Sequence, residues 1–164
     1  MVMKIRDLMT KQVASVRASD STAVAARLMW DCDCGAVPVI DEDGHAIAMI
    51  TDRDICMAAL MRDRAPSAIP VAETMSRDLR FCGPDDNVAA AEQMMRTHQI
   101  RRIPVLDAER RVLGVLSLAD IVRATDSQKG RATREVAPEE VAVTLADICA
   151  TPAREAGRAT PPSM

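Results

Sequence analysis

The stretch AMITDRDICMAAL, residues 48–60, has the pattern of a strand that runs directly into a helix, with Thr51 and Asp54 at the junction. Sixty-six residues later the stretch GVLSLADIVRAT has the same form, with Ser117 and Asp120 at the junction. A hydroxyl at a helix start can accept a hydrogen bond from a free backbone N–H, and an acid in the first turn offsets the helix dipole. Two such corners at one offset indicate an internal repeat.

The repeat extends well beyond the two corners. Residues 7–56 align with residues 73–122 without a gap, and ten of the fifty paired positions are identical. Each copy predicts the element order β-α-β-β-α, with an alanine- and methionine-rich helix after the first strand. The predicted elements lie at 13–16, 22–31, 36–41, 46–51 and 51–60, and again at 79–82, 88–98, 102–107, 112–117 and 117–125. Because one such unit buries little surface, we expect an α/β fold in which two repeats pack with pseudo-twofold symmetry into one module with a shared core.

The repeat also predicts how the 164 residues are divided. The expected parts are residues 1–65 as the first repeat unit, 66–125 as the second, and 126–164 as a linker, a short helix and a disordered tail. Pro138 suits the first position of that helix, because it has no N–H to satisfy. We expect Val141, Leu145 and Ile148 on one face of the helix, which would dock on the pair or on its dimer mate.

Charge and aromatic content exclude several function classes. The chain has 21 basic and 24 acidic residues, a net charge of −3, and its aromatic residues are Trp30 and Phe81. Nucleic-acid binding rests on clustered basic side chains and aromatic stacking, so we expect no nucleic-acid partner. No apolar run is long enough to span a bilayer and no export signal opens the chain, so we expect a cytoplasmic protein without a membrane partner. No pattern suggests a nucleophile with its base, and we expect no enzymatic activity.

The five cysteines are an odd number, which with no export signal favours reduced thiols. Three of them align with apolar residues of the other copy and are therefore expected to be buried. These are Cys34, Cys56 and Cys82. Cys32 aligns with His98 and is expected to be exposed, which makes it the candidate for a redox-active thiol. A Cys-X-Cys pair without a second Cys or His pair is a weak zinc site, so we predict no metal site.

Six short motifs in the two copies together resemble those of the CBS domain. They are DLMT at 7–10, GAVPVIDEDG at 35–44, ITDRDI at 50–55, ETMS at 73–76, HQIRRIPVLD at 98–107 and VLSLADI at 115–121. Two such units in tandem resemble a CBS pair, or Bateman module, over roughly residues 5–125. No catalytic domain accompanies the pair, so the chain looks like a stand-alone CBS-pair protein. The stretch TLADICATPA at 144–153 is also similar to the end of small bacterial CBS-pair proteins of the hypoxic-response type.

The resemblance implies a cleft for an adenosyl nucleotide such as AMP, ATP or S-adenosylmethionine, with no cofactor required. In nucleotide-binding relatives the carboxylate of each corner contacts ribose, the hydroxyl contacts phosphate, and apolar residues enclose the adenine. Basic residues before the second buried strand face phosphate, for which a planar guanidinium is well suited. The implied site residues are Asp54 and Asp120 for ribose, Thr51 and Ser117 for phosphate, Arg101 and Arg102 for phosphate, and Val37, Pro38, Ile103 and Pro104 for the apolar lining.

Each implied role has a plainer alternative. Both hydroxyl–carboxylate pairs would be explained equally well as helix caps, and the two arginines could instead pair with acidic side chains at the surface. The first copy has Gly35 and Ala36 where the second has the arginines, and Ala48 where the second has Gly114. We expect the extra methyl of Ala48 to crowd a ligand, so that the first site is the weaker one.

Three functions remain open. The first is a regulatory signalling module in which an adenosyl nucleotide favours one conformation over another. The second is a ligand-free, stress- or hypoxia-associated interaction protein that contacts an unknown protein partner through its dimer surface or its tail. The third is a thiol sensor that acts through Cys32. A homodimer is expected, because helix faces rich in Ala and Met are left exposed, and Trp30 at an outer helix position would mark a dimer or partner surface.

Overall fold

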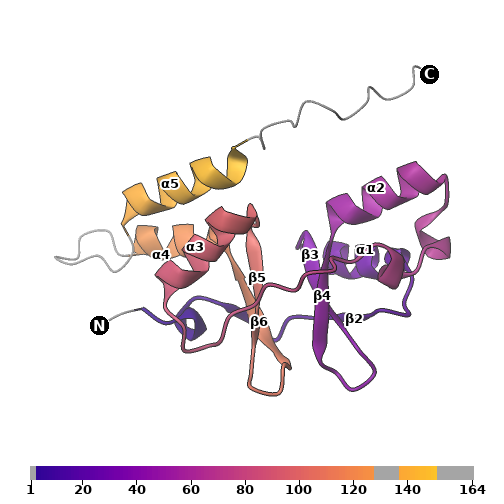
Figure 1. Cartoon of the computed structure of the whole chain (residues 1–164), viewed down its shortest axis with the longest axis horizontal. Helices are drawn as coiled ribbons and strands as arrows, with labels where there is room; N and C mark the ends of the chain where they lie inside the picture. Colours follow the sequence, from indigo (N-terminus) through magenta and orange to yellow (C-terminus); the bar gives the residue numbers. More distant parts are fainter. Residues whose placement is uncertain (1–2, 128–136, 151–164) are drawn as a thin grey trace.

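The computed structural model describes residues 3–127 and 137–150. It contains two three-stranded sheets side by side, each flanked by helices (Figure 1). The helices are α1 (Thr22–Asp31), α2 (Asp52–Arg62), α3 (Val88–His98), α4 (Leu118–Ser127) and α5 (Pro138–Cys149); the strands are β1 (Thr10–Lys11), β2 (Val16–Arg17), β3 (Ala36–Ile40), β4 (Ala46–Thr51), β5 (Arg102–Leu106) and β6 (Val112–Ser117). Single turns of 3-10 helix lie at Ile5–Asp7, Pro66–Ala68 and Val71–Glu73. Within the described ranges no helix is long and apolar enough to cross a bilayer.

The first strand of each copy is shorter than predicted. In the first copy it is β2, which pairs in parallel with β3 over only Val16 and Arg17. In the second copy it shrinks to one parallel bridge between Cys82 and Val105. Pro84 follows two residues later, and proline cannot extend a ladder because it has no N–H to donate. The helices and the antiparallel hairpins lie where the repeat predicts them.

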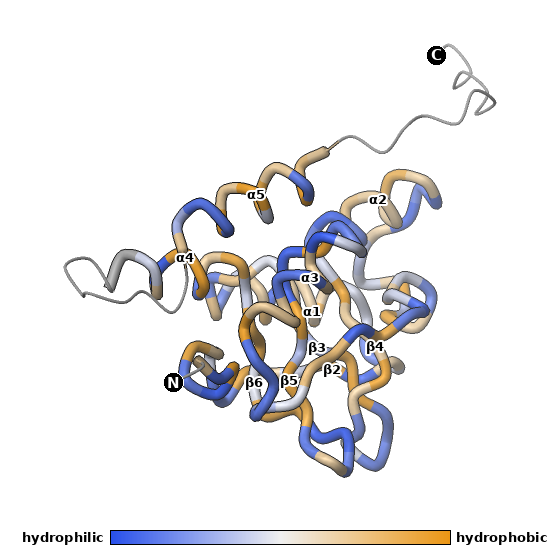
Figure 2. The backbone as a smooth tube through the Cα atoms, turned by 60° about the vertical axis from the view of Figure 1, so that its left-hand side comes forward, coloured by the Kyte–Doolittle hydropathy of each residue, from blue (hydrophilic) through white to orange (hydrophobic). Residues whose placement is uncertain are grey.

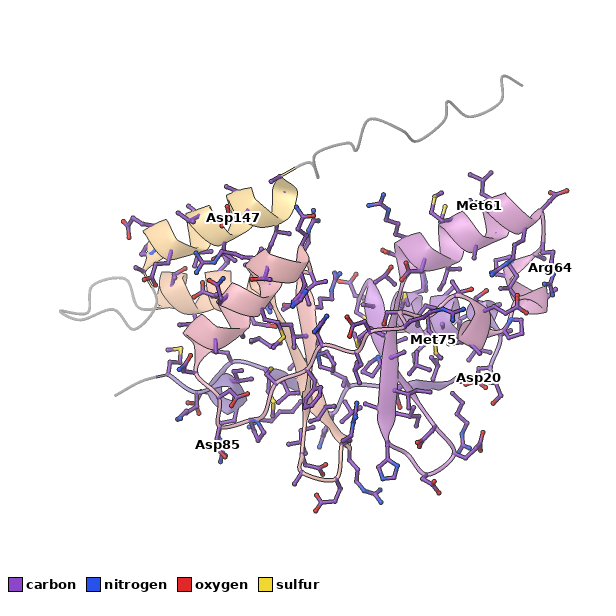
Figure 3. All side chains as sticks on the ribbon, viewed as in Figure 1. Asp20, Met61, Arg64, Met75, Asp85 and Asp147 are labelled. Carbon is purple, nitrogen blue, oxygen red and sulfur yellow. The ribbon has the colours of Figure 1, made fainter. Side chains whose placement is uncertain are left out.

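The segment in front of each repeat packs on the other repeat, which the sequence did not predict. β1 precedes the first copy but pairs antiparallel with β6 of the second. At the symmetry-related place, the N–H of Ser76 donates to the carbonyl oxygen of Met49 in β4 over 2.9 Å. A second symmetry-related pair of backbone hydrogen bonds joins Ile5 N to Asp86 O over 3.1 Å and Val71 N to Asp20 O over 2.8 Å. Figure 3 labels Asp20 and Met75, which lie beside this second crossing. The two repeats are therefore tied together by an exchange of their leading segments.

The apolar side chains form two buried clusters instead of the single shared core that was predicted. One cluster joins α1, α2, β3 and β4, and it includes Val71 from the segment before the second repeat. The other joins α3, α4, α5, β5 and β6, and it includes Ile5 from the segment before the first repeat. The segment that precedes each repeat thus completes the core of the other one. Each half therefore depends on the other for part of its buried area.

The last helix, α5, starts at Pro138 as predicted and packs on α3 and α4 (Figure 1). Its buried face consists of Val141, Thr144 and Ile148. Leu145, which we expected on that face, is 46% exposed. The spacing of three and four residues between the buried positions follows one stripe of the helix, and Leu145 stands beside this stripe. The predicted face is therefore wrong at this position.

Helix α3, on which α5 packs, carries two polar side chains whose hydrogen-bonding groups are only partly satisfied. Glu92 on α3 is 3% exposed, and its Oε1 has no hydrogen-bond partner; the same is true of Nε of Arg96 one turn later. Burial, then the negative charge of Glu140 on α5, raise the pKa of Glu92, and Arg96 and Thr144 lower it by less. The equivalent positions on α1 are occupied by Ala26 and Trp30. The contact between α3 and α5 therefore carries an electrostatic cost.

Glu92→Gln is expected to stabilise the protein by about 1 kcal/mol at neutral pH, because it removes a buried carboxylate with an unpaired oxygen. The pKa of Glu92 is higher in the folded state, so the unfolded chain loses this proton first. Wild-type stability should therefore fall as pH rises from the ordinary carboxyl pKa through the raised one, and the gap between variant and wild type should close in acid. Thermal unfolding across this pH range, followed by circular dichroism, measures the gap. The control is Glu109→Gln at an exposed loop position, and a gap independent of pH would contradict the assignment.

Candidate functional site

A cleft of about 750 Å³ opens between the two halves of the molecule. Its walls come from the segment after β1, the end of α1, the starts of β3 and β5, the first turn of α4, and α5. Six of the ten implied site residues line it: Val37, Pro38, Arg101, Arg102, Ser117 and Asp120. The other four, Thr51, Asp54, Ile103 and Pro104, do not line this cleft. Among the implied residues, the cleft thus brings together two apolar ones from the first repeat and four polar ones from the second.

The corner at Ser117 places a nearly buried carboxylate at the edge of the cleft. Asp120 is 7% exposed, and its Oδ2 accepts hydrogen bonds from the Ser117 N–H over 2.8 Å and from the Ser117 hydroxyl over 2.6 Å. The N–H of Asp120 donates back to the Ser117 hydroxyl oxygen over 3.2 Å. The other carboxylate oxygen, Oδ1, contacts the guanidinium of Arg123. Oδ2 is therefore committed to the helix cap, and Oδ1 is the oxygen that a ligand would reach.

The corner at Thr51 has the same internal geometry. Oδ2 of Asp54 accepts from the Thr51 N–H over 2.9 Å and from the Thr51 hydroxyl over 2.7 Å, and the Asp54 N–H donates to that hydroxyl over 3.1 Å. These bonds form a complete capping box at the start of α2. Capping accounts for the local bonds at both corners, so it cannot by itself distinguish them. What distinguishes them is that the Ser117 corner faces the cleft.

Three arginines give the cleft a cationic side. Arg101 and Arg102 precede and open β5, and Arg123 lies one turn after Asp120 on α4. Within the part of the chain that the structure describes, neither Arg101 nor Arg102 forms an ion pair with a carboxylate, which favours a ligand role over surface pairing. Sequence reasoning missed Arg123; its spacing of three residues from Asp120, on a face of the same helix, was the available signal. The cleft is therefore lined by three basic side chains and by two acidic ones, Asp33 and Asp120.

Apolar residues line the cleft from both halves, with Val115, Leu118, Ala119, Val122 and Leu145 on the side of the second half. Val37 and Pro38 lie at the start of β3, next to Val13 and Ala14 from the segment between β1 and β2. Ile103 and Pro104 are buried in β5, where Ile103 belongs to the core of the second half. A flat apolar ring such as adenine has room to pack against Val37 and Pro38 at the start of β3, in the same cleft as Asp120 and the arginines.

The difference between Ala48 and Gly114 has a structural cause instead of the predicted one. A side-chain carbon on Gly114 would lie under 3.0 Å from the carbonyl oxygen of Thr10 in β1 and 3.1 Å from Sδ of Met9. Ala48 is fully buried in the core of the first half, where it pairs with Val39. The expected crowding of a ligand by the Ala48 methyl is therefore wrong. Glycine stands at position 114 because β1 passes against it.

The cysteines divide differently from the prediction. Cys82 is buried as expected, and desolvation, with the nearby charge of Asp86, raises its pKa to about 12. Cys56 is exposed and Cys34 is only partly buried, so these two predictions are wrong. Cys56 lies on the outer side of α2, just as its repeat mate Val122 lies exposed on α4. Cys32 is exposed as expected, and it lines the cleft together with Cys34. The redox role of Cys32 stays a prediction.

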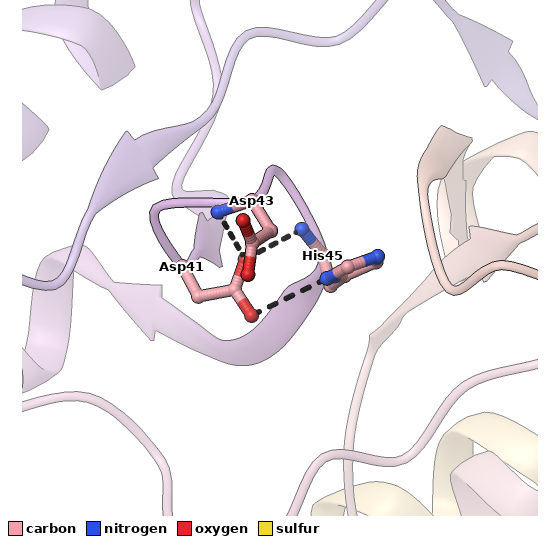
Figure 4. Close-up of side chains that lie close together, drawn as sticks. All are labelled: Asp41, Asp43 and His45. Atoms are coloured by element: carbon pink, nitrogen blue, oxygen red, sulfur yellow. Dashed lines mark hydrogen bonds and ion pairs between the residues drawn. The ribbon is translucent and has the colours of Figure 1, made fainter.

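One group of acidic and histidine side chains lies close enough together to be considered as a metal site. Ligand atoms of Asp41, Asp43 and His45 lie within 4.8 Å of one another at the turn between β3 and β4 (Figure 4). The contacts of Asp41 are those of turn closure, because its Oδ1 accepts from the backbone N–H of His45 over 2.8 Å and of Asp43 over 3.0 Å. The hydrogen bond from the His45 backbone is the main cause that lowers the pKa of Asp41. Asp107 closes the second hairpin in the same way, so the group needs no cation to explain it.

The comparison with protein families gives one match that occurs twice. The model of the CBS domain matches residues 5–61 and again residues 67–127. The CBS domain-containing protein YhcV of Bacillus subtilis is 38% identical over 117 residues, which cover 71% of this chain and 81% of that protein. Hypoxic response protein 1 of Mycobacterium tuberculosis is 30% identical over 118 residues, which cover 72% of this chain and 82% of that protein.

Solved structures show the same arrangement. The crystal structure of hypoxic response protein 1 with two coordinated zinc ions has a TM-score of 0.68 to this chain, with 30% identity, and the match covers 74% of this chain and 98% of that one. The crystal structure of the CBS domain pair of protein MJ0100, in complex with methylthioadenosine and S-adenosyl-L-methionine, has a TM-score of 0.71 at 26% identity. That match covers 79% of this chain and 100% of that one.

Proposed function

This chain belongs to the CBS-domain family, with two copies of the domain in tandem, and from this premise we propose that it is a non-enzymatic regulatory module that senses an adenosyl nucleotide in the cleft. One observation carries the proposal: a capped carboxylate, three arginines and an apolar wall line the same cleft of about 750 Å³. The related CBS pair of MJ0100 with its two adenosyl ligands supports the chemical class.

The residue roles follow from the placement of charge. Oδ1 of Asp120 accepts hydrogen bonds from the ribose hydroxyls and exchanges its contact with Arg123 for them. Arg101 and Arg102 bind phosphate oxygens, which match the planar fork of a guanidinium. The adenine packs against Val37 and Pro38. Because the cleft carries more cations than acids, we infer that AMP or ATP binds more tightly than S-adenosylmethionine, whose sulfonium is positively charged.

Isothermal titration of the full chain with AMP, ATP and S-adenosylmethionine tests the proposal. We expect micromolar binding of a phosphorylated ligand, with an affinity that falls as salt concentration rises. Bound ligand should also slow alkylation of Cys32, because this thiol lines the cleft. No binding by any of the three ligands would overturn the proposal. The ligand-free interaction protein would then be the better-supported function, with the exposed apolar helices of the first repeat as its contact surface.

We also propose that the chain is a homodimer that associates through the helices of the first repeat. Trp30 on α1 is 85% exposed, and Leu60 and Met61 on α2 are 73% and 79% exposed. Figure 2 shows hydrophobic residues along α2 on the outside of the molecule, and Figure 3 labels Met61 there. On the second repeat the corresponding helices, α3 and α4, are covered by α5. The first repeat thus offers the open helical face.

Met61→Asp is expected to convert the dimer into a monomer, because it places a charge in the middle of the apolar contact. Size-exclusion chromatography with light scattering measures the mass. The control is Val143→Asp on α5, which introduces the same charge at an exposed apolar side chain of a helix outside the proposed contact. A wild-type chain that is monomeric, or a Met61→Asp variant that stays dimeric, would contradict this surface.

A further inference from the structure

Helix α5 lies outside both CBS repeats yet forms part of the cleft. The second family match ends at residue 127, and α5 begins at Pro138. Leu145 of this helix lines the cleft, as does the first turn of α4. Val122 and Arg101 line the same cleft. A ligand in the cleft would therefore meet a side chain that neither repeat supplies.

The end of α5 is attached to the segment that carries the cleft arginines. Nε2 of Gln99 donates to the carbonyl oxygens of Ala150 over 2.8 Å and of Asp147 over 3.4 Å. Nη2 of Arg101 lies 3.9 Å from Sγ of Cys149. Gln99 ends α3 in a left-handed conformation, two residues before Arg101. A movement of α5 would therefore release contacts of the loop that holds Arg101.

Polar groups on α3 weaken the docking of α5 on that helix. Helix α5 brings Glu140 toward Glu92, whose Oε1 is buried without a partner, and Nε of Arg96 one turn along α3 is buried without a partner too. Unpaired buried polar atoms favour the state in which water can reach them. On its apolar side the helix is held by Val141 and Ile148, which join the core of the second half. This combination suits a helix that can both dock and leave.

We propose that α5 is a movable wall of the nucleotide cleft, which a bound ligand fastens onto α3 and α4 through Leu145 and Arg101. This rests on the proposed nucleotide binding. Because the ligand contacts Leu145 only when α5 is docked, ligand and docked helix stabilise each other by the same factor. Release of α5 uncovers the helical face of the second repeat, the counterpart of the open face on the first. Ligand binding is thereby linked to which helical faces the module presents.

Two substitutions in the full chain test this wall. Leu145→Ala removes the ligand contact and is expected to weaken binding of the nucleotide found by titration, AMP or ATP, roughly 5- to 20-fold. Val143→Ala is the matched control, since Val143 is equally exposed on α5 but does not line the cleft, and it should bind as the wild type does. Ile148→Asp undocks α5 without touching the cleft and should weaken binding by a similar factor.

Amide hydrogen exchange supplies a readout that affinity alone does not. Ligand should protect the amides of 138–149 in the wild type and less so in Leu145→Ala, and Ile148→Asp should expose them even without ligand. One outcome would contradict the movable wall but keep the nucleotide site. In it, Leu145→Ala and Ile148→Asp bind nucleotide as tightly as the wild type does, and the ligand leaves hydrogen exchange in α5 unchanged. If the wild type binds none of the ligands, the nucleotide site fails and the wall fails with it.

Discussion

Asp120→Ala is expected to weaken binding of the adenosyl nucleotide roughly 100-fold, because two ribose hydroxyls would each lose a hydrogen bond to a charged acceptor worth about 1.5 kcal/mol. The carboxylate is nearly buried at the edge of the cleft, where water can replace these bonds poorly. Arg123 loses its partner in the same substitution and can turn toward the ligand, which would offset part of the loss for a phosphorylated ligand. Isothermal titration with AMP and ATP measures the change.

The variant also removes a helix cap, so stability must be separated from recognition. Asp54→Ala is the matched control, because Asp54 makes the same three hydrogen bonds with Thr51 that Asp120 makes with Ser117. Each variant should lose about 1 kcal/mol of stability, but only Asp120→Ala should lose affinity at the cleft. An Asp120→Ala variant that binds like the wild type would show that the ribose assignment is wrong.

The control carries information of its own about a second site. Thr51, Asp54, Ile103 and Pro104 remain a prediction for a related site that the described cleft does not include. If the wild type binds two ligands and Asp54→Ala binds one, the second site exists at that corner. If Asp54→Ala weakened the cleft as much as Asp120→Ala does, both effects would come from the lost caps, and the ribose assignment would again fail.

Gly114→Ala is expected to destabilise the fold by about 3 kcal/mol, at the upper end of what an overpacked position costs. The new methyl carbon would lie under 3.0 Å from the Thr10 carbonyl oxygen, a backbone atom that cannot turn aside. β1 would have to leave β6, although its pairing with β6 helps to join the N-terminal segment to the second half. Urea unfolding at equilibrium measures the change from the transition midpoint.

The matched control for this strand contact is Gly83→Ala. The atoms nearest to a methyl carbon there belong to the Asp86 carboxylate, at 3.6 Å or more, which is ordinary contact. Its stability should stay close to that of the wild type. A Gly114→Ala variant as stable as Gly83→Ala would mean that β1 is not held against β6, and the exchange of leading segments would lose its main support.

The candidate site was predictable in part, and the limits have identifiable causes. Ser117, Asp120 and the two arginines were found because the corner and the basic pair are local motifs, and the resemblance gave them roles. The same motif at Thr51 and Asp54 looks identical in the sequence, and its hydrogen bonds are identical in the structure. Which corner faces the described cleft depends on how the two halves pack. Leu145 was missed because its helix lies outside the repeat and its partners are distant in the chain.

The sequence by itself determined the duplication, the order of helices and strands in each copy, the capped corners and the membership of the CBS-domain family. These features depend on the helical and strand periodicities and on caps, which act over a few residues. Only the tertiary structure decided that β1 crosses to the second half, that two cores replace one, and that α5 covers α3 and α4 with Leu145 in the cleft. Such contacts join residues far apart in the chain, and no local pattern distinguishes β1 paired with its own repeat from β1 paired with the other. Packing made that choice, because the exchanged segments complete the buried area that each repeat alone lacks.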